Sequence, residues 1–338
     1  MSAAPRLADL RRALEETLGA GRVMADVPLA PFTTFKVGGR ADLFVQPRTG
    51  EELVAVLRGA VEHGVPCTML GGGSNVLVAD AGVRGLVIHP RGGLIAEEDP
   101  PNGEGAPRAL VRADAAVTIN ELVRWTVGRG LAGLEAWAGT PGTVGGGIYG
   151  NAHWAGRLLS ERVHSVVLWS PLSGAATVPG SEMEFGYDRS RLQRTGEVLL
   201  RARFELEPGE PSALRSIARE SLAYRKGTQP LNTPSAGCVF QNPQAADPVP
   251  PGVPFSAGAL IDRAGLKGLR TGGACVSPVH ANFIVNDQGA SARDIHRLIE
   301  RCRLQVRERF GVELRDEIVC LGDFTAAEKE SARVDTPD

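Results

Sequence analysis

The chain has 338 residues, of which 43% are hydrophobic and 22% charged, with a formal net charge of −2 at pH 7. This length allows two or three domains that each bury an apolar core. The near-neutral charge lacks the basic field that nucleic-acid binding requires, and no apolar run is long enough to span a bilayer, so we expect neither nucleic acid as a partner nor membrane insertion.

Hydrophobic periodicity predicts the elements of the N-terminal part. Apolar residues at helical spacing predict helices over residues 7–18, 51–63 and 119–127. Runs rich in β-branched and aromatic residues predict strands over residues 32–47, 67–70, 85–88 and 109–113. Residues 91–107 are polar and rich in Gly and Pro, and we expect them to form a mobile excursion on the surface.

The C-terminal part contains the same mixture of elements. Strands are predicted over residues 163–169, 198–204, 274–276, 283–285 and 317–321. Helices are predicted over residues 212–224, 257–265 and 290–310. The charged segment after Phe324 is expected to be disordered. Helices and strands in alternation, joined by many Gly- and Pro-containing turns, indicate a loop-rich α/β build.

Two glycine-rich stretches are the most informative local feature. Residues 139–151 contain six glycines, and residues 71–75 read Gly-Gly-Gly-Ser-Asn directly after a predicted strand. Glycine allows positive φ and close approach to the main chain, and clustered N–H groups bind anions. Neither stretch matches the G-x-G-x-x-G or P-loop fingerprint. Together they indicate a ligand with a diphosphate and a long flat body; the alternative is a pair of tight surface turns.

The N-terminus and the cysteines indicate the compartment. Residues 1–18 contain several charged side chains and lack the apolar region of a signal peptide. The five cysteines are scattered, without a C-x-x-C pair, and the histidines show no metal-ligand spacing. This pattern is typical of a reducing compartment. We expect a cytoplasmic protein that binds no metal.

Eight short motifs follow one another in a specific order between Phe32 and Gly322. They are residues 34–39 (TFKVGG), 71–77 (GGGSNVL), 139–146 (GTPGTVGG), 185–187 (FGY), 234–243 (PSAGCVFQNP), 265–268 (GLKG), 280–283 (HANF) and 311–314 (GVEL). In this combination the chain resembles the UDP-N-acetylenolpyruvoylglucosamine reductase family, flavoenzymes of early peptidoglycan synthesis.

The resemblance implies an α+β fold. It consists of a two-lobed FAD-binding fold of the vanillyl-alcohol-oxidase (PCMH) type, followed by a C-terminal α/β substrate domain. The short span between Tyr187 and Arg225 indicates the compact form of the family. The expected divisions are an N-terminal helix (1–27), a first FAD-binding lobe (28–92), a second lobe (93–224), the substrate-binding domain (225–324) and a disordered tail (325–338).

The implied reaction is the NADPH-dependent reduction of UDP-N-acetylglucosamine enolpyruvate to UDP-N-acetylmuramate through bound FAD. The enolate that forms needs a stabilising charge and then a proton. By resemblance, Cys238 takes the place of the proton donor and Glu317 that of the catalytic glutamate. The family has Tyr-Arg-x-Ser where this chain has Asp188, so the arginine role falls to Arg189. The alternatives are a buried filler at Cys238, a solvated Glu317 and an exposed Arg189.

The resemblance also names binding residues. Tyr187, Lys226 and Asn242 are the expected substrate contacts. The expected FAD contacts come from the two glycine-rich stretches and are Gly71, Gly72, Gly73, Ser74, Asn75, Val76, Gly139, Thr140, Pro141, Gly142, Gly145 and Gly146. Two other functions remain open: an FAD-dependent oxidase on the same fold, and a flavin- or nucleotide-binding regulator without turnover. We expect a monomer.

Overall fold

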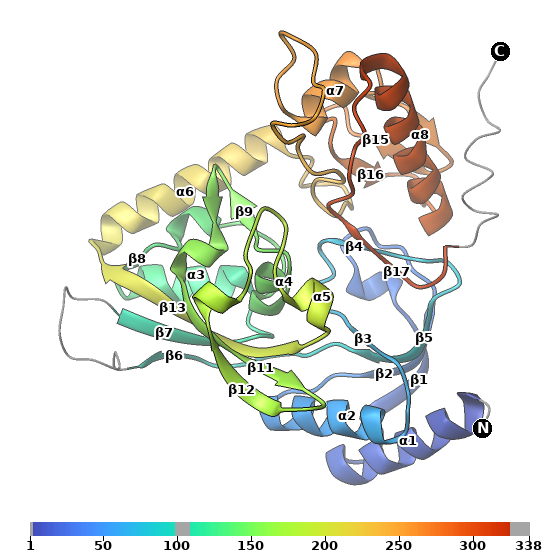
Figure 1. Cartoon of the computed structure of the whole chain (residues 1–338), viewed down its shortest axis with the longest axis vertical. Helices are drawn as coiled ribbons and strands as arrows, with labels where there is room; N and C mark the ends of the chain where they lie inside the picture. The colour runs from blue at the N-terminus through green and yellow to red at the C-terminus, as the bar shows by residue number, and fades with distance from the viewer. Residues whose placement is uncertain (1–2, 99–108, 325–338) are drawn as a thin grey trace. The chain divides into compact units, whose positions relative to one another are not determined.

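The computed structural model describes residues 3–98 and 109–324 (Figure 1). The chain divides into two compact units, each made of segments that are distant in the sequence. Unit 1 comprises Met1–Ala25, Leu43–Gly72 and Gly85–Tyr224, and unit 2 comprises Asp26–Asp42, Gly73–Arg84 and Arg225–Asp338. Within the described ranges, no helix combines the length and the apolar character needed to cross a membrane. The predictions for residues 99–107 and for the C-terminal tail fall outside these ranges.

The N-terminal elements pack two helices against a four-stranded sheet. They are α1 (Ala3–Leu18), β1 (Val23–Pro28), β2 (Arg40–Val45), α2 (Gly50–Glu62), β3 (Cys67–Met69) and β5 (Val83–Ile88). The strand order is β1-β2-β5-β3, with β3 parallel to β5. Helices α1 and α2 lie side by side (Figure 1), and their Leu10, Leu14 and Leu53 share one buried core with Ile88. Apolar spacing correctly predicted both helices.

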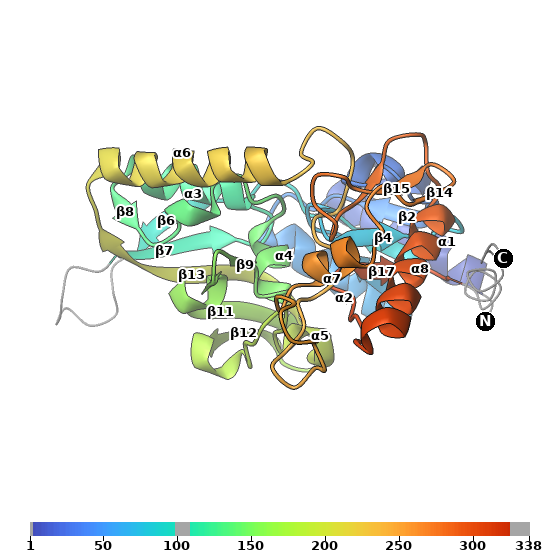
Figure 2. The same ribbon diagram turned by 90° about the horizontal axis from the view of Figure 1, so that it is seen from above.

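The larger part of unit 1 is a six-stranded antiparallel sheet covered by helices. Its main elements are β6 (Ile95–Glu98), β7 (Ala109–Asp114), α3 (Ile119–Gly128), β8 (Leu131–Ala132), β11 (Val163–Ser170), β12 (Gly174–Pro179), β13 (Val198–Pro208) and α6 (Pro211–Thr228). The order is β12-β11-β13-β7-β6, and β8 pairs with β13. Helices α3 and α6 lie next to each other in both views (Figures 1 and 2), where Leu122, Leu214 and Phe204 share a core.

Unit 2 packs two helices on a small sheet. Its elements are β4 (Val76–Val78), α7 (Ala257–Arg263), β14 (Arg270–Thr271), β15 (Ala274–Val276), β16 (Ile284–Asn286), α8 (Ala292–Phe310) and β17 (Val319–Leu321). Leu298 and Ile299 of α8 are buried with Leu260 of α7 and Val276 of β15. Strand β17 lies parallel to β4 and thereby joins the end of the described chain to its first quarter.

The predicted strand over residues 32–47 is wrong in its first half. Strand β2 begins only at Arg40, because the preceding residues form a turn. Thr33 Oγ1 donates to the carbonyl oxygen of Val37 at 2.8 Å, and Lys36 has a φ of 59°. A positive φ is incompatible with an extended strand. The β-branched composition of these residues therefore reports their burial and not their backbone conformation.

The surface excursion predicted over residues 91–107 is partly corrected. Residues 95–98 form β6, which pairs with β7 along its length. Glu98 at the end of β6 accepts a hydrogen bond from Arg203 Nε at 2.7 Å and lies 3.4 Å from Arg112 Nη1. A charged strand on a sheet edge lacks the apolar alternation on which strand prediction depends.

Candidate active site

Within unit 1, Gly71 and Gly72 of the first glycine-rich loop lie against the second glycine-rich loop. A Cβ built at Gly72 would lie 2.7 Å from Gly142 Cα, and one built at Gly71 would lie 2.8 Å from Thr143 Oγ1. Real Cβ atoms do not approach backbone carbon this closely, so the contact requires glycine at position 72. The structure therefore brings together the two stretches that the sequence singled out.

Asn120 holds the second glycine loop by both ends of its side-chain amide. Its Oδ1 accepts a hydrogen bond from the N–H of Gly139 at 2.7 Å, and its Nδ2 donates to the carbonyl oxygen of Thr140 at 3.0 Å. The loop then enters the short helix α4 (Val144–Tyr149), where Thr143 Oγ1 accepts from the N–H of Gly146. Sequence analysis missed Asn120, because nothing in the sequence distinguishes it from any other asparagine in a first helical turn.

His89 forms a hydrogen bond at the start of the first glycine loop. The side chain is buried, and Nδ1 donates to the carbonyl oxygen of Leu70 at 2.9 Å, one residue before Gly71. Burial lowers the pKa of His89, and the hydrogen bond to Leu70 acts in the opposite direction. The neutral ring with its proton on Nδ1 is therefore the form that holds this loop.

The first glycine loop presents backbone donors. Among the described residues, none accepts a hydrogen bond from the N–H groups of Gly72, Gly73 or Ser74. Gly73 has a φ of 64°, and a Cβ there would lie 2.0 Å from the carbonyl oxygen of Phe32. Consecutive N–H groups in such a turn form a concavity suited to an anion. This donor set fits the diphosphate of a dinucleotide.

In unit 2, the segments that carry Cys238 and Glu317 run side by side. The N–H of Glu317 donates to the carbonyl oxygen of Val239 at 2.8 Å. Gln241 lies two residues after Val239 and Arg315 two residues before Glu317, and the N–H of Gln241 donates to the carbonyl oxygen of Arg315, also at 2.8 Å. This antiparallel pairing brings together the two residues that sequence analysis assigned to proton donation and charge stabilisation. Both side chains are half-buried.

Asn75 holds Glu317 from a second direction. Its Nδ2 donates to the carbonyl oxygen of Glu317 at 3.0 Å, and its own carbonyl oxygen accepts from the N–H of Val319 at 3.0 Å. The next residue, Val76, begins β4 and pairs with Val319. The backbone of Glu317 is thus fixed between Val239 and Asn75.

Asn282, from the motif His-Ala-Asn-Phe, supports the residues that follow Cys238. Its Oδ1 accepts from the N–H of Phe240 at 3.0 Å, and its Nδ2 donates to the carbonyl oxygen of Phe240 at 2.7 Å. Its own carbonyl oxygen accepts from the N–H of Val239 at 2.8 Å. The side chain is 3% exposed, so these bonds have no competition from water. Sequence analysis assigned no role to Asn282.

Arg225 is a buried, positively charged residue of unit 2. Burial lowers the pKa of its guanidinium to about 10, and a Coulombic interaction with Cys238 opposes that shift. The next residue, Lys226, is exposed. Asn242 is also exposed, and its Oδ1 accepts from the N–H of Ala257 at 3.1 Å, where α7 begins. The roles of Lys226 and Asn242 in substrate binding stay predictions.

Tyr187, Asp188 and Arg189 lie in a tight turn of unit 1. The N–H of Gly186 donates to the carbonyl oxygen of Arg189 at 3.0 Å, and the N–H of Arg189 donates back at 3.2 Å. Asp188 has a φ of 52°. The strict alternation of a strand therefore does not decide where Arg189 points. Arg189 is exposed, and its assignment stays a prediction.

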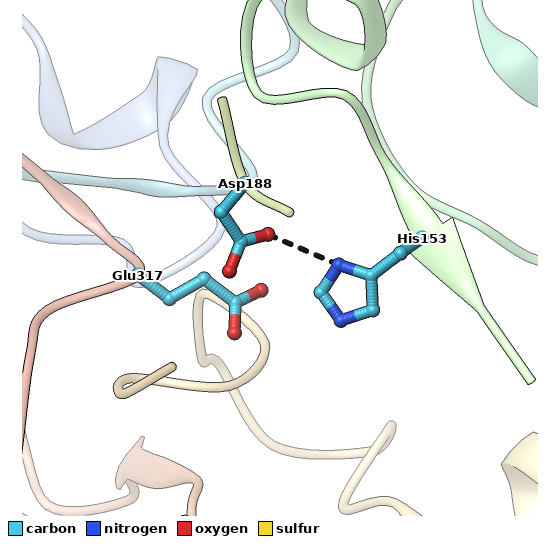
Figure 3. A group of neighbouring side chains, drawn as sticks. All are labelled: His153, Asp188 and Glu317. Carbon is cyan, nitrogen blue, oxygen red and sulfur yellow. Dashed lines mark ion pairs between the residues drawn. The ribbon is translucent and has the colours of Figure 1, made fainter. Parts of the chain in front are cut away.

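The carboxylate of Asp188 is directed at a histidine that sequence analysis did not single out. Asp188 Oδ1 lies 3.0 Å from Nδ1 of His153, which belongs to β9 (His153–Trp154) (Figure 3). The imidazole also packs against the ring of Tyr187, with 4.7 Å between the ring centroids. A predicted substrate contact, an acidic side chain and an imidazole therefore form one cluster in unit 1.

Two family models match the chain. The model described as an FAD binding domain matches residues 41–172. The model described as the C-terminal domain of UDP-N-acetylenolpyruvoylglucosamine reductase matches residues 229–321. The expected fold class, an α+β protein in which an FAD-binding fold precedes a C-terminal domain, is confirmed.

Three similar proteins are UDP-N-acetylenolpyruvoylglucosamine reductases. The UDP-N-acetylenolpyruvoylglucosamine reductase of Anaeromyxobacter dehalogenans (strain 2CP-1 / ATCC BAA-258) is 40% identical over 310 residues, covering 92% of this chain and 89% of the relative. The reductase of Synechococcus sp. (strain RCC307) is 38% identical, with coverages of 91% and 96%. The crystal structure of UDP-N-acetylenolpyruvylglucosamine reductase (MurB) from Thermus caldophilus has a TM-score of 0.70 at 33% identity, over 89% of this chain and 99% of that chain.

Proposed function

The chain belongs to the UDP-N-acetylenolpyruvoylglucosamine reductase family, and we infer that it reduces UDP-N-acetylglucosamine enolpyruvate to UDP-N-acetylmuramate with bound FAD. The observation that carries this inference is the 40% identity to a named reductase over 92% of the chain. The product is a precursor of peptidoglycan. NADPH as the source of the hydride is the corresponding proposal for the electron donor.

The glycine loops are the proposed holders of FAD. When bound, FAD supplies the hydride chemistry, because it accepts a hydride from a reduced nicotinamide and passes it to the substrate. The contact between Gly72 and Gly142 and the backbone donors of Gly73 and Ser74 support this assignment. The remaining proposed contacts are Gly71, Asn75, Val76, Gly139, Thr140, Pro141, Gly145 and Gly146.

Cys238 is the proposed proton donor to C2 of the substrate. The S–H bond breaks as the C2–H bond forms, which leaves a thiolate on Cys238. The Coulombic interaction of Cys238 with the guanidinium of Arg225 stabilises that thiolate. Glu317, paired through its backbone with Val239, is proposed as a general acid or stabiliser of the enolate as negative charge develops on the substrate. Tyr187, Lys226, Asn242 and Arg189 are the proposed contacts with the remaining substrate groups.

A spectroscopic assay of the purified full chain tests the function. NADPH absorbance is followed with and without the UDP-enolpyruvyl sugar, while an electrode records dissolved oxygen. Substrate-dependent NADPH oxidation without oxygen uptake is the expected result. Oxygen uptake in the absence of this sugar would instead identify an oxidase, and a yellow protein with neither activity would identify a regulator.

The role of Cys238 is tested in the same assay by separating the two half-reactions. We expect Cys238→Ala to leave flavin reduction by NADPH intact and to slow substrate reduction at least about a hundredfold, the usual contribution of a positioned acid. Cys238→Ser should retain part of the rate. Cys302→Ala, which removes a thiol from the core of unit 2, is the control for a cysteine that acts only in packing. Equal loss of both half-reactions in Cys238→Ala would contradict the donor role.

We also propose that the protein is cytoplasmic and monomeric. All five cysteines lie in the described ranges, and none of them forms a disulfide there. Thiols kept reduced, together with a nucleotide-sugar substrate and a nicotinamide donor, support a cytoplasmic location. A monomer is proposed, and light scattering of the purified protein tests it.

A further inference from the structure

Arg303 of helix α8 reaches the segment that leads into Glu317, the proposed general acid or stabiliser of the enolate. Its Nη2 donates to Asp316 Oδ1 at 2.6 Å, and its Nη1 donates to the carbonyl oxygen of Leu314. Both partners belong to the residues just before Glu317. One side chain of the helix thereby holds a carboxylate and a main-chain group of this segment.

Arg303 also contacts the segment that contains Cys238. Its Cζ lies 5.5 Å from the centroid of the Phe240 ring, and Phe240 is 1% exposed. Phe240 and Asp316 lie opposite each other in the antiparallel bridge between the two segments. The guanidinium therefore contacts both members of this pair, one through a hydrogen bond and the other through its ring.

The main-chain pairing between the two segments is short. Phe240 and Asp316 form a bridge, which is flanked by two main-chain hydrogen bonds of 2.8 Å. A two-stranded pairing of this kind is marginal by itself in water. A side chain that holds the pairing from a neighbouring helix can therefore change where the side chains of Cys238 and Glu317 start.

A second ion pair also holds the segment, but it is more exposed. Arg315 Nη2 lies 2.5 Å from Asp247 Oδ2, and the side chain of Arg315 is 43% exposed. Exposed pairs contribute little to stability. The side chain of Arg303 is 18% exposed and one of its partners, Leu314, is buried, so its contacts have less competition from water. Arg303 is therefore the stronger of the two anchors.

We propose that Arg303 is a positioning residue for substrate reduction, which holds residues 314–316 so that the carboxyl of Glu317 and the thiol of Cys238 start from positions competent for the reaction. This inference rests on the proposed function. Arg303 acts through its contacts with the paired segments, and no contact with substrate or flavin and no proton transfer is assigned to it. A displacement of about 1 Å can lower the rate about a hundredfold, so loss of this anchor should slow turnover.

Separate measurement of the two half-reactions of the FAD-loaded protein tests the proposal. Arg303→Met removes the guanidinium and keeps a long apolar side chain. We expect it to slow reduction of the UDP-enolpyruvyl sugar about 10- to 100-fold at saturating sugar, with KM for the sugar within about threefold of wild type. Flavin reduction by NADPH should stay within about twofold of wild type, because that step uses neither Glu317 nor Cys238.

Two further variants distinguish positioning from simple packing. Lysine keeps the charge but replaces the planar fork with one compact donor group, so Arg303→Lys should recover part of the rate. Asp316→Ala removes one hydrogen-bond partner of Arg303. The double variant Arg303→Met with Asp316→Ala should be hardly slower than Arg303→Met alone, whereas independent effects would multiply.

Arg301→Met is the matched control on the same helix. Arg301 Nη1 donates to the carbonyl oxygen of Arg270 at 3.2 Å and to Thr271 Oγ1 at 3.1 Å, and both partners belong to β14 and not to the paired segments. Urea denaturation records the stability of each variant. Arg301→Met should reduce the sugar at the wild-type rate, even where it loses as much stability as Arg303→Met.

The outcomes separate this inference from the proposed function. A wild-type rate of sugar reduction in folded Arg303→Met would overturn this inference alone, and so would a wild-type rate in Arg303→Lys where Arg303→Met does not fold. Equal slowing of both half-reactions would also overturn it. A wild-type protein that neither binds nor reduces the sugar would overturn the proposed function and this inference with it.

Discussion

The backbone N–H of Glu317 donates to the carbonyl oxygen of Val239 at 2.8 Å, directly beside Cys238. The segments of the carboxyl and the thiol proposed for catalysis are therefore paired through the main chain. This pairing fixes where each of the two side chains starts. The residues that maintain the pairing should then influence the reaction without touching the substrate.

Asn282→Ala tests that dependence. The substitution leaves both the N–H and the carbonyl oxygen of Phe240 without their partner in a buried site. We expect it to lower the free energy of unfolding by about 2–4 kcal/mol, the cost of two unpaired backbone groups, and to lower kcat. Urea denaturation and substrate turnover measure the two effects. Asn282→Asp, which loses the donor and turns a buried carboxylate oxygen towards the carbonyl oxygen of Phe240, should be at least as destabilising at neutral pH. Full kcat in a folded Asn282→Ala variant would contradict the supporting role.

Gly72→Ala tests the contact between the glycine loops. The new Cβ would lie 2.7 Å from Gly142 Cα, so the loops must separate. We expect FAD affinity to fall by at least about tenfold, equivalent to 1.4 kcal/mol, with little change in the cores. Quenching of flavin fluorescence on titration measures the affinity. Gly128→Ala is the matched control, because a Cβ at Gly128 meets nothing within 4 Å. Equal FAD affinity of the two variants would contradict the proposed role of the glycine loops in FAD binding.

Asn120→Ala removes the two side-chain hydrogen bonds that hold the second glycine loop. Because the N–H of Gly139 and the carbonyl oxygen of Thr140 lose their partner, the loop should sample other conformations and bind FAD about tenfold more weakly. Flavin titration again measures the effect. Asn286→Ala is the control, since Asn286 also uses both ends of its amide, towards Phe35 and Ala290 in unit 2. The prediction fails if both variants lose FAD equally.

His89 should make the stability of unit 1 depend on pH. Burial lowers the folded-state pKa of His89 below the ordinary value of 6.5. The unfolded chain therefore takes up a proton near pH 6.5, and the folded chain does so only at lower pH. It follows that the stability contributed by the neutral ring is complete above pH 6.5 and is lost as the pH falls through 6.5 towards the folded pKa.

A comparison of His89→Gln with wild type measures this contribution. Between pH 7 and pH 5, the free energy of unfolding of wild type should fall more steeply than that of His89→Gln. Urea titrations at each pH provide the slopes, and His63→Gln controls for loss of a histidine elsewhere in the unit. Parallel slopes for wild type and His89→Gln would show that His89 is not the group responsible.

Much of the fold was predictable because packing follows periodicity. The apolar stripes of α1, α2 and α8 repeat at helical spacing over three turns or more, and each helix is found where it was predicted. Strands β5, β7 and β15 carry β-branched residues at buried positions and were also predicted. Strand β6 was missed because Glu97 and Glu98 interrupt its apolar alternation; Glu98 instead forms ion pairs with Arg112 and Arg203.

The supporting residues of the site were not predictable in this way. Asn120 and Asn282 act through a few hydrogen bonds, and His153 through an ion pair, to residues distant in the sequence. A periodic pattern carries no information about such partners. The glycine stretches could be recognised because their composition is unusual in itself. Their mutual contact, however, depends on how the strands between them fold, and it emerged only from the structure.

The parallel pairing of β17 with β4 has a consequence for biosynthesis. The main-chain partners of Asn75 and Val76 are made only when synthesis reaches Val319, so unit 2 stays incomplete until β17 has left the ribosome. Closing so long a loop is entropically slow, and nascent chains cut short before β17 should expose the β4 edge to other molecules. Premature termination before Val319 should therefore yield aggregated polypeptide and not a weakened enzyme.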